Sequence, residues 1–133
     1  MVPFKIKFSP GQSIFDQVVF AAIKSILAGE LKAGEDFPSV RTLALDLKIH
    51  PNSAHKVVQH LIQERWLTVQ PGVGTVVAQT PKARAGDRKH LLEHDVEKLV
   101  VEAIRVGASL DEVQQAVEDT WTDLRGLKII VNE

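Results

Sequence analysis

The 133-residue sequence lacks several residue types that define common protein classes. It has no cysteine, which excludes disulfides, cysteine-ligated zinc and thiol catalysis. Aromatic residues make up only 5%, and tyrosine is absent. No apolar run approaches the roughly 18 residues of a membrane span, and the chain does not start like a signal peptide. We therefore expect a soluble, cytoplasmic protein with one compact domain, or a small domain with an appendage.

The formal net charge of −1 conceals an uneven distribution. Residues 1–90 carry twelve Lys and Arg against seven Asp and Glu, whereas residues 91–133 carry four against ten. The first segment is therefore basic and the second acidic. Such a split indicates that the first segment faces a polyanion and that the second has another role.

The hydrophobic periodicity predicts three helices in the basic segment. Apolar residues at steps of three and four begin after Ser13, which suits an N-cap, and stop at Gly29. Pro38 and Ser39 then introduce a short second helix, with Ser39 as its cap. The intervening stretch has two glycines and little periodicity, so we expect a loop there.

A tight link over residues 48–50 leads to the third predicted helix. We expect Asn52 to cap this helix, with Pro51 just outside it. One face is apolar at helical spacing, and the opposite face is rich in hydrogen-bond donors with no carboxylate before Glu64. Such a face suits contact with phosphates and base edges.

Two β-rich runs, residues 66–70 and 75–78, are joined by a proline- and glycine-containing turn and predict a hairpin. Residues 79–88 carry proline, glycine and charge but little apolar material, which is typical of a linker. A long amphipathic helix is predicted from about Lys89 to Gly107.

The last predicted helix opens with a capping box, in which Ser109 is followed three residues later by Glu112. We expect Gly126 to end it and residues 128–131 to form a short extended tail, whose role the sequence leaves open.

Each C-terminal helix has one apolar stripe, and an isolated hairpin this small cannot bury both. A second copy of the chain would cover them in a two-fold symmetric four-helix arrangement. The alternative is that the stripes fold back onto the first three helices of the same chain. The residues expected at a dimer interface are Leu92, Val96, Leu99, Val100, Leu110, Val113, Val117 and Leu124.

The predicted fold is mostly α with a small β-hairpin. It comprises an N-terminal winged helix-turn-helix over residues 1–78, a linker over 79–88 and a two-helix dimerisation unit over 89–133. In a helix-turn-helix the second helix fits the major groove of DNA, which is about 12 Å wide. Glycines at the tip of the hairpin allow its backbone to approach DNA closely.

Three ordered segments resemble motifs of the GntR family of bacterial transcription regulators. Residues 37–44, FPSVRTLA, resemble the family motif LPSVRELA. Residues 49–58 resemble the segment that opens the recognition helix, and residues 67–77 resemble the wing with its Gly-x-Gly-Thr turn. The short C-terminal part is similar to that of the YtrA-like subfamily.

The resemblance implies which residues contact DNA. Arg41 stands where the family has an arginine that contacts the DNA backbone or a base edge. The first turn of the recognition helix supplies further contacts, and the wing tip, which begins at Pro71, enters or skirts the minor groove. The recognition-helix residues are Asn52, Ser53, His55 and Lys56, and the wing residues are Gly72, Val73, Gly74 and Thr75.

Two positions depart from the family pattern, because many relatives carry Arg or Gln in place of His55, and Lys or Arg in place of Val73. Loss of charge from the wing removes phosphate contacts and weakens binding. A histidine against phosphate makes affinity rise as the pH falls. As an alternative to a DNA contact, Arg41 could form a surface ion pair with Asp46 or Glu35.

The histidines and serines give no firm sign of metal or catalytic chemistry. His50, His55 and His60 recur every five residues, which does not place them on one helical face. His90 and His94 are four apart and can bind a metal, but ordinary polar positions near a helix start are favoured. No phosphate loop or Gly-x-Ser-x-Gly motif is present, so we expect no enzyme, no cofactor and no metal site.

The sequence thus predicts a homodimeric, DNA-binding repressor of transcription that recognises an inverted repeat in double-stranded DNA. Two alternatives remain open. One is a winged-helix protein-interaction module without DNA binding, which the near-neutral net charge and Val73 favour. The other is a metal-responsive regulator that uses His90 and His94. The operator, the regulated genes and any small-molecule effector are not defined by the sequence.

Overall fold

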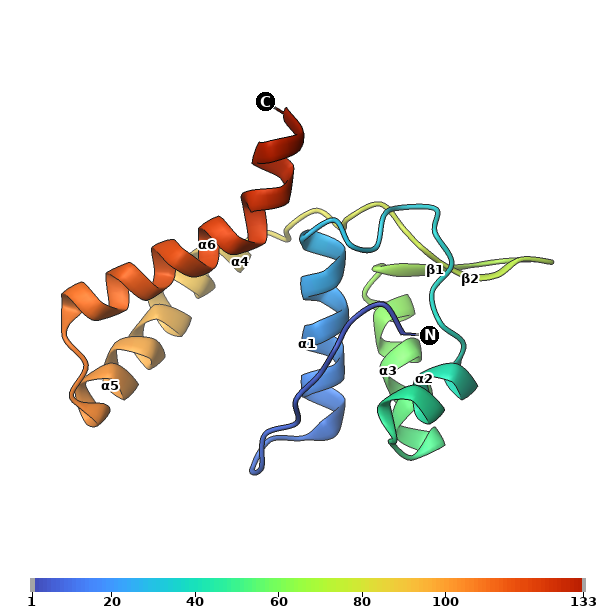
Figure 1. The fold of residues 1–133 in the computed structure, drawn as a ribbon, viewed down its shortest axis with the longest axis horizontal. Helices are drawn as coiled ribbons and strands as arrows, with labels where there is room; N and C mark the ends of the chain where they lie inside the picture. Colours follow the sequence, from blue (N-terminus) through green and yellow to red (C-terminus); the bar gives the residue numbers. More distant parts are fainter. Residues whose placement is uncertain (1, 133) are drawn as a thin grey trace. The chain divides into compact units, whose positions relative to one another are not determined.

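The structure, a computed structural model, describes residues 2–132, with side chains described up to residue 125. The chain divides into two compact units, Met1–Pro81 and Lys82–Glu133, here called the first and second units. Figure 1 labels the α-helices and β-strands of both. The first unit contains α1 (Ile14–Leu27), α2 (Val40–Leu47), α3 (Pro51–Gln63), β1 (Leu67–Gln70) and β2 (Gly74–Val77). The second contains α4 (Asp87–His90), the π-helical segment η1 (Leu91–Asp95), α5 (Val96–Val106) and α6 (Leu110–Asn132).

The predicted fold class, mostly α with one small hairpin, is confirmed. None of the helices in the described part of the chain combines the length and the apolar character that crossing a membrane requires.

The predicted caps of α1 and α2 are confirmed. The Ser13 hydroxyl accepts a hydrogen bond from the Asp16 N–H at 2.9 Å, and the Ser39 hydroxyl accepts one from the Thr42 N–H at 3.1 Å. Each bond satisfies a backbone donor that has no partner within its helix. Gly29, with φ 84°, occupies the left-handed conformation that ends α1.

The predicted cap of α3 is wrong by two residues. His50 is the N-cap, and its Nδ1 accepts a hydrogen bond from the Asn52 N–H at 3.0 Å. Pro51 is the first helical residue rather than a residue outside the helix. The physical reason is that the proline φ suits the first helical position, where no N–H is needed. Asn52 therefore lies inside the helix and does not cap it.

The core of the first unit lies between the three helices and the hairpin (Figure 1). Burial of each large apolar side chain stabilises the fold by roughly 1.5–3 kcal/mol. The N-terminal segment also contributes, because Val2 and Phe4 are buried and the Val2 N–H donates to Asp46 Oδ2 at 2.8 Å. The largest fully buried apolar side chains are Leu43, Leu61, Leu67, Val18, Val57 and Val77.

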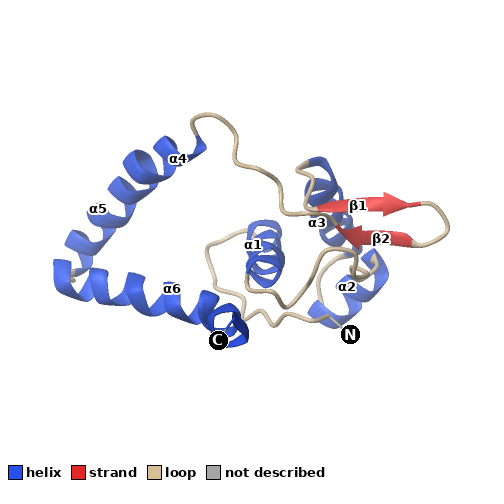
Figure 2. Ribbon diagram, turned by 90° about the horizontal axis from the view of Figure 1, so that it is seen from above, coloured by secondary structure: helices blue, strands red, loops and turns tan. Residues whose placement is uncertain are grey.

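The hairpin pairs β1 and β2 antiparallel, with Leu67 opposite Val77 and Gln70 opposite Gly74 (Figure 2). The stretch predicted as a loop before α2 is only partly one. Its last residues run along β2, with a bridge between Asp36 and Val76 and a hydrogen bond from the Phe37 N–H to the Thr75 carbonyl at 2.9 Å. This pairing anchors the hairpin to the start of α2, and no local periodicity reveals it because the partner lies about 40 residues away along the chain.

In the second unit, α4, η1 and α5 follow one another without interruption and end at Gly107, as predicted, in a left-handed conformation with φ 80°. The predicted end of α6 at Gly126 is wrong, and so is the extended tail over residues 128–131, because α6 continues to Asn132. Glycine inside a helix costs only about 1 kcal/mol relative to alanine, which the surrounding helix can absorb. The side chains of this last stretch lie outside the described residues.

Candidate nucleic-acid interface

Helix α3 has two sharply different faces. Its buried face, Ala54, Val57, Val58 and Leu61, packs into the core and holds the helix against α1, α2 and β1. The opposite face is exposed, and we call it the outer face of α3. Its residues are Asn52, His55, Lys56, Gln59 and Gln63.

The outer face of α3 offers hydrogen-bond donors and one formal positive charge, with no carboxylate. The first turn of α3 contains no acidic residue, and the positive end of the helix macrodipole lies there. Ser53, half-buried beside this face, adds a hydroxyl. Amide, hydroxyl, imidazole and ammonium groups at a helix N-terminus are suited to phosphate oxygens and to the acceptor-rich edges of bases.

Helix α2 presents Arg41 to solvent at its second residue. The two carboxylates considered as alternative ion-pair partners of Arg41 both accept hydrogen bonds from backbone donors. Glu35 accepts from the Lys32 N–H at 3.1 Å, and Asp46 accepts from the Val2 N–H at 2.8 Å. Arg41 itself is exposed beside the N-terminus of α2, where an anion is favoured.

The turn between α2 and α3 is built on Lys48, which has the left-handed conformation φ 56°, ψ 47°. Its N–H donates to the Ala44 carbonyl and closes α2. Lys48 is exposed and is not among the residues predicted to contact DNA.

The wing tip is determined by backbone conformation. Gly72 and Gly74 have φ values of 78° and 114°, and a Cβ at either position would meet no atom within 4 Å. The glycines are therefore required for their conformation rather than for space within this chain. Between them Val73 is 62% exposed, and Thr75 behind them is half-buried.

His60 belongs to α3 but has a packing role. Its ring lies edge-on to Phe15 of α1, with 5.3 Å between centroids. His55, by contrast, is exposed on the outer face. Only His55 and the capping His50 are therefore placed near the N-terminal end of α3, in agreement with the prediction that the three histidines do not share a face.

A short helix, a turn, a second helix with one exposed polar face and a two-stranded hairpin together define a winged helix-turn-helix regulatory protein. The family model described as bacterial regulatory proteins, gntR family, matches residues 16–77, which span α1 to β2. Residues 16–77 of this chain therefore match the GntR family, whose model describes bacterial regulatory proteins.

Two relatives from Bacillus subtilis (strain 168) match nearly the whole chain. The chain is 25% identical over 126 residues to the HTH-type transcriptional repressor YtrA, covering 92% of this chain and 97% of that protein. It is 21% identical over 117 residues to the uncharacterised HTH-type transcriptional regulator YhcF, covering 88% and 96%. The resemblance to the YtrA-like subfamily thus extends beyond the winged helix-turn-helix.

Solved structures support the fold. A transcriptional antiterminator from Listeria monocytogenes EGD-e is similar with a TM-score of 0.75 and 22% identity, covering 91% of each chain. YtrA from Sulfolobus acidocaldarius, a GntR-family transcription factor, gives a TM-score of 0.51 at 24% identity, covering 90% of this chain and 97% of that one.

The eight residues predicted for a dimer interface all lie in the second unit. Six of them are exposed, and Val113 and Leu124 are half-buried. Figure 2 shows why these stripes are not covered within the unit, since α5 and α6 diverge from the turn at Gly107. Among residues 82–125 no side chain is buried. Other large apolar side chains of this unit that stay exposed are Leu91, Val101, Ile104, Val106 and Trp121.

Proposed function

We propose that this protein is a cytoplasmic, sequence-specific DNA-binding repressor that acts as a homodimer on an inverted-repeat operator. The observation that carries the proposal is the outer face of α3, which is exposed and free of carboxylates while the opposite face is fixed in the core. A rigid helix with such a face can enter the major groove without losing its packing.

In the proposed complex, the first turns of α3 lie against base edges. Asn52, Ser53 and His55 would read bases, whereas Lys56 would neutralise a phosphate. Arg41, at the start of α2, would contact the backbone or a base edge beside the same groove. The wing tip, from Gly72 to Thr75, would approach the minor groove through backbone groups, because Val73 brings no charge there.

The homodimer is supported by the exposed apolar stripes of α5 and α6. An open helix pair of this kind gains most by burying its stripes against a second copy, and the acidic charge of this unit suits a position away from DNA. Two-fold symmetry would then place two α3 helices on two half-sites of an inverted repeat. Repression is proposed because the B. subtilis relative YtrA is a transcriptional repressor.

The proposal is tested by selecting bound duplexes from random DNA with the full-length protein and measuring their affinity across salt concentrations. The expected result is an inverted repeat, bound with an affinity that falls steeply as salt rises. Selection of a direct repeat or a single half-site would contradict the symmetric dimer. Absence of binding to any duplex would favour the alternative of a protein-interaction module, with the exposed Val73 as part of its surface.

The variant Lys56→Ala separates phosphate contacts from base contacts. It should weaken binding to all duplexes similarly and reduce the slope of log affinity against log salt by about 1. The matched control is Lys24→Ala, which removes an exposed lysine from the last turn of α1 and should leave the slope unchanged. Ser53→Ala should instead change which operator is preferred, and an equal loss on every duplex would contradict its assignment to a base.

A further inference from the structure

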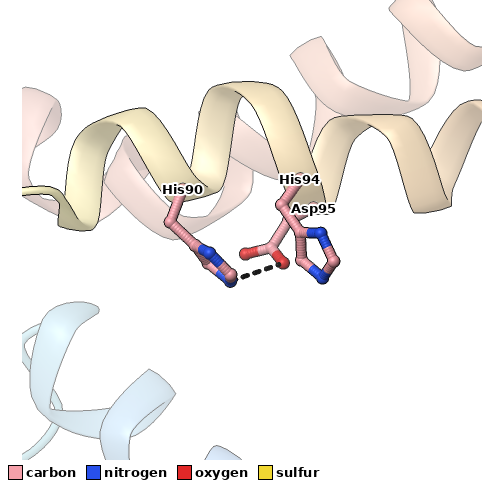
Figure 3. Close-up of side chains that lie close together, drawn as sticks. All are labelled: His90, His94 and Asp95. Atoms are coloured by element: carbon pink, nitrogen blue, oxygen red, sulfur yellow. Dashed lines mark ion pairs between the residues drawn. The ribbon is translucent and has the colours of Figure 1, made fainter.

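The start of the second unit gathers three metal-ligating side chains that the DNA-binding proposal does not use. His90, His94 and Asp95 each offer a ligand atom, and these atoms lie within 4.8 Å of one another. Figure 3 shows the two imidazoles and the carboxylate projecting from the same side of the helix. No other such cluster occurs among the residues whose side chains the structure describes.

The backbone explains why Asp95 joins the two histidines. In a regular α-helix His94 would lie below His90, but Asp95, five residues on, would be rotated about 140° away at 100° per residue. Here residues 91–95 are π-helical, and the Val96 N–H donates to the Leu91 carbonyl five residues earlier. The wider turn brings His94 and Asp95, which are four and five residues after His90, onto the same side of the helix as His90. Such π-helical turns are rare and frequently lie at functional sites.

The distances between the three side chains are close to those expected when the same groups bind a metal ion. His90 Nε2 lies 3.6 Å from Asp95 Oδ1, and the imidazole centroids are 4.5 Å apart. Metal–ligand bonds of about 2.0–2.2 Å place neighbouring donors roughly 3–3.5 Å apart, so small rotations of exposed side chains suffice. All three residues are exposed, which leaves the remaining coordination positions to water.

We propose that His90, His94 and Asp95 form a binding site for a divalent transition-metal ion. Two imidazoles and one carboxylate select Zn²⁺, Ni²⁺, Co²⁺ or Cu²⁺ over Mg²⁺ and Ca²⁺, which prefer sites made only of oxygen. The metal replaces the ion pair between His90 and Asp95 and holds the π-helical turn at the beginning of the helix that continues into α5. The sequence pattern favoured ordinary polar positions near a helix start here, and regular α-helical spacing does not bring Asp95 beside the two histidines.

The test is titration of the full-length, tag-free protein with Ni²⁺ or Zn²⁺ by calorimetry, and with Co²⁺ by visible absorption. We expect one ion per chain, and at least about tenfold weaker binding for each of His90→Gln, His94→Gln and Asp95→Asn. The matched control is Glu93→Gln, which removes a carboxylate of the same π-helical segment that lies outside the cluster and should bind metal like the unchanged protein.

Circular dichroism of each variant establishes that the helices remain folded, so that weak binding is not mistaken for unfolding. Equal binding of Mg²⁺ and Ni²⁺ would show only diffuse attraction to an acidic surface and would overturn the proposal. So would undiminished binding in the three ligand variants, or no binding by the unchanged protein. None of these results bears on DNA binding by the first unit, so the two proposals fail independently.

Discussion

Lys48 carries the backbone strain of the turn between α2 and α3. A residue other than glycine in the left-handed region costs roughly 1–2 kcal/mol. Substitution by glycine removes this strain, but part of the gain is lost because glycine is more flexible in the unfolded chain. Lys48→Gly should therefore raise the free energy of unfolding by about 0.5–1 kcal/mol, measured by urea denaturation. Lys24→Gly is the matched control, because the same change inside α1 should lower stability by about 1 kcal/mol. Loss of stability in both variants would contradict the strain assigned to Lys48.

His50 caps α3 through the hydrogen bond that its Nδ1 accepts from the Asn52 N–H. Loss of the imidazole acceptor leaves the Asn52 N–H without its partner, so His50→Ala should destabilise the first unit by about 0.5–1 kcal/mol. His50→Asn should restore much of this, because asparagine is a preferred N-cap. His55→Ala removes an exposed imidazole from the same helix and should leave the thermal midpoint nearly unchanged. A similar loss in both alanine variants would show that the cap is unimportant.

At the scale of elements, α5 and α6 are held by local charged contacts that depend on pH. The Glu112 carboxylate accepts from the Ser109 N–H at 3.0 Å while the Ser109 hydroxyl accepts from the Glu112 N–H at 3.1 Å, which confirms the predicted capping box. Two hydrogen bonds with Ser109 lower the pKa of Glu112 below its ordinary value of 4.5, and the bond from the Ser109 backbone N–H contributes more than the bond with its side chain. The side-chain hydrogen bond from Arg105 likewise lowers the pKa of Glu102.

The sign of the pH effect follows from these lowered pKa values. A carboxylate with a pKa that is lower in the folded state stabilises that state above its unfolded pKa, and the stabilisation is lost as the pH falls through the folded pKa. We expect helicity to decline as the pH is lowered below about 4.5, as measured by far-ultraviolet circular dichroism. Glu112→Gln keeps an acceptor oxygen for Ser109 but does not titrate, so its decline should be smaller. An identical decline in both proteins would contradict a role for this cap.

The elements also show how far local sequence patterns reach. Ser13, Ser39, Gly29, Gly107 and the Ser109–Glu112 pair define helix ends correctly, because each acts within four residues of the chain. The strand pairing near Asp36 and the burial of the N-terminal segment depend on partners far along the sequence. The predicted end of α6 is wrong because one glycine is a weak stop signal when the residues beyond it can continue a helix.

For the whole molecule, the critical prediction concerns association through the second unit. Val100 and Val101 are neighbours but point about 100° apart, with Val100 on the predicted interface stripe and Val101 beside it. They are 44% and 61% exposed, so either tolerates glutamate without loss of a core contact. Val100→Glu should yield a monomer by analytical ultracentrifugation, because burying a carboxylate at an apolar interface is costly. Val101→Glu is the matched control and should remain dimeric.

Loss of the dimer should also change operator binding in a specific way. Two linked recognition helices gain affinity because the second binding event is intramolecular, and such gains reach about 10²–10⁴-fold. Val100→Glu should lose a factor of this size on the inverted repeat while binding a single half-site as tightly as the unchanged chain. If Val100→Glu and Val101→Glu were both dimeric, or both monomeric, the assignment of the Val100 stripe to the dimer interface would be contradicted.

The sequence alone determined the succession of helices and strands, most of their caps, the class of fold and most of the outer face of α3, although it also placed His60 outside, where the structure packs it against Phe15. These properties follow from periodicity, from capping and from turn chemistry, all of which act over a few neighbouring residues. Only the tertiary structure decided which residue caps α3, what packs under the N-terminal segment and how His90, His94 and Asp95 come together. The packing of the N-terminal segment depends on a contact between residues 44 positions apart, which no local pattern reveals. The cap of α3 and the His–Asp cluster are local, but they depend on backbone geometry that the residue pattern does not specify.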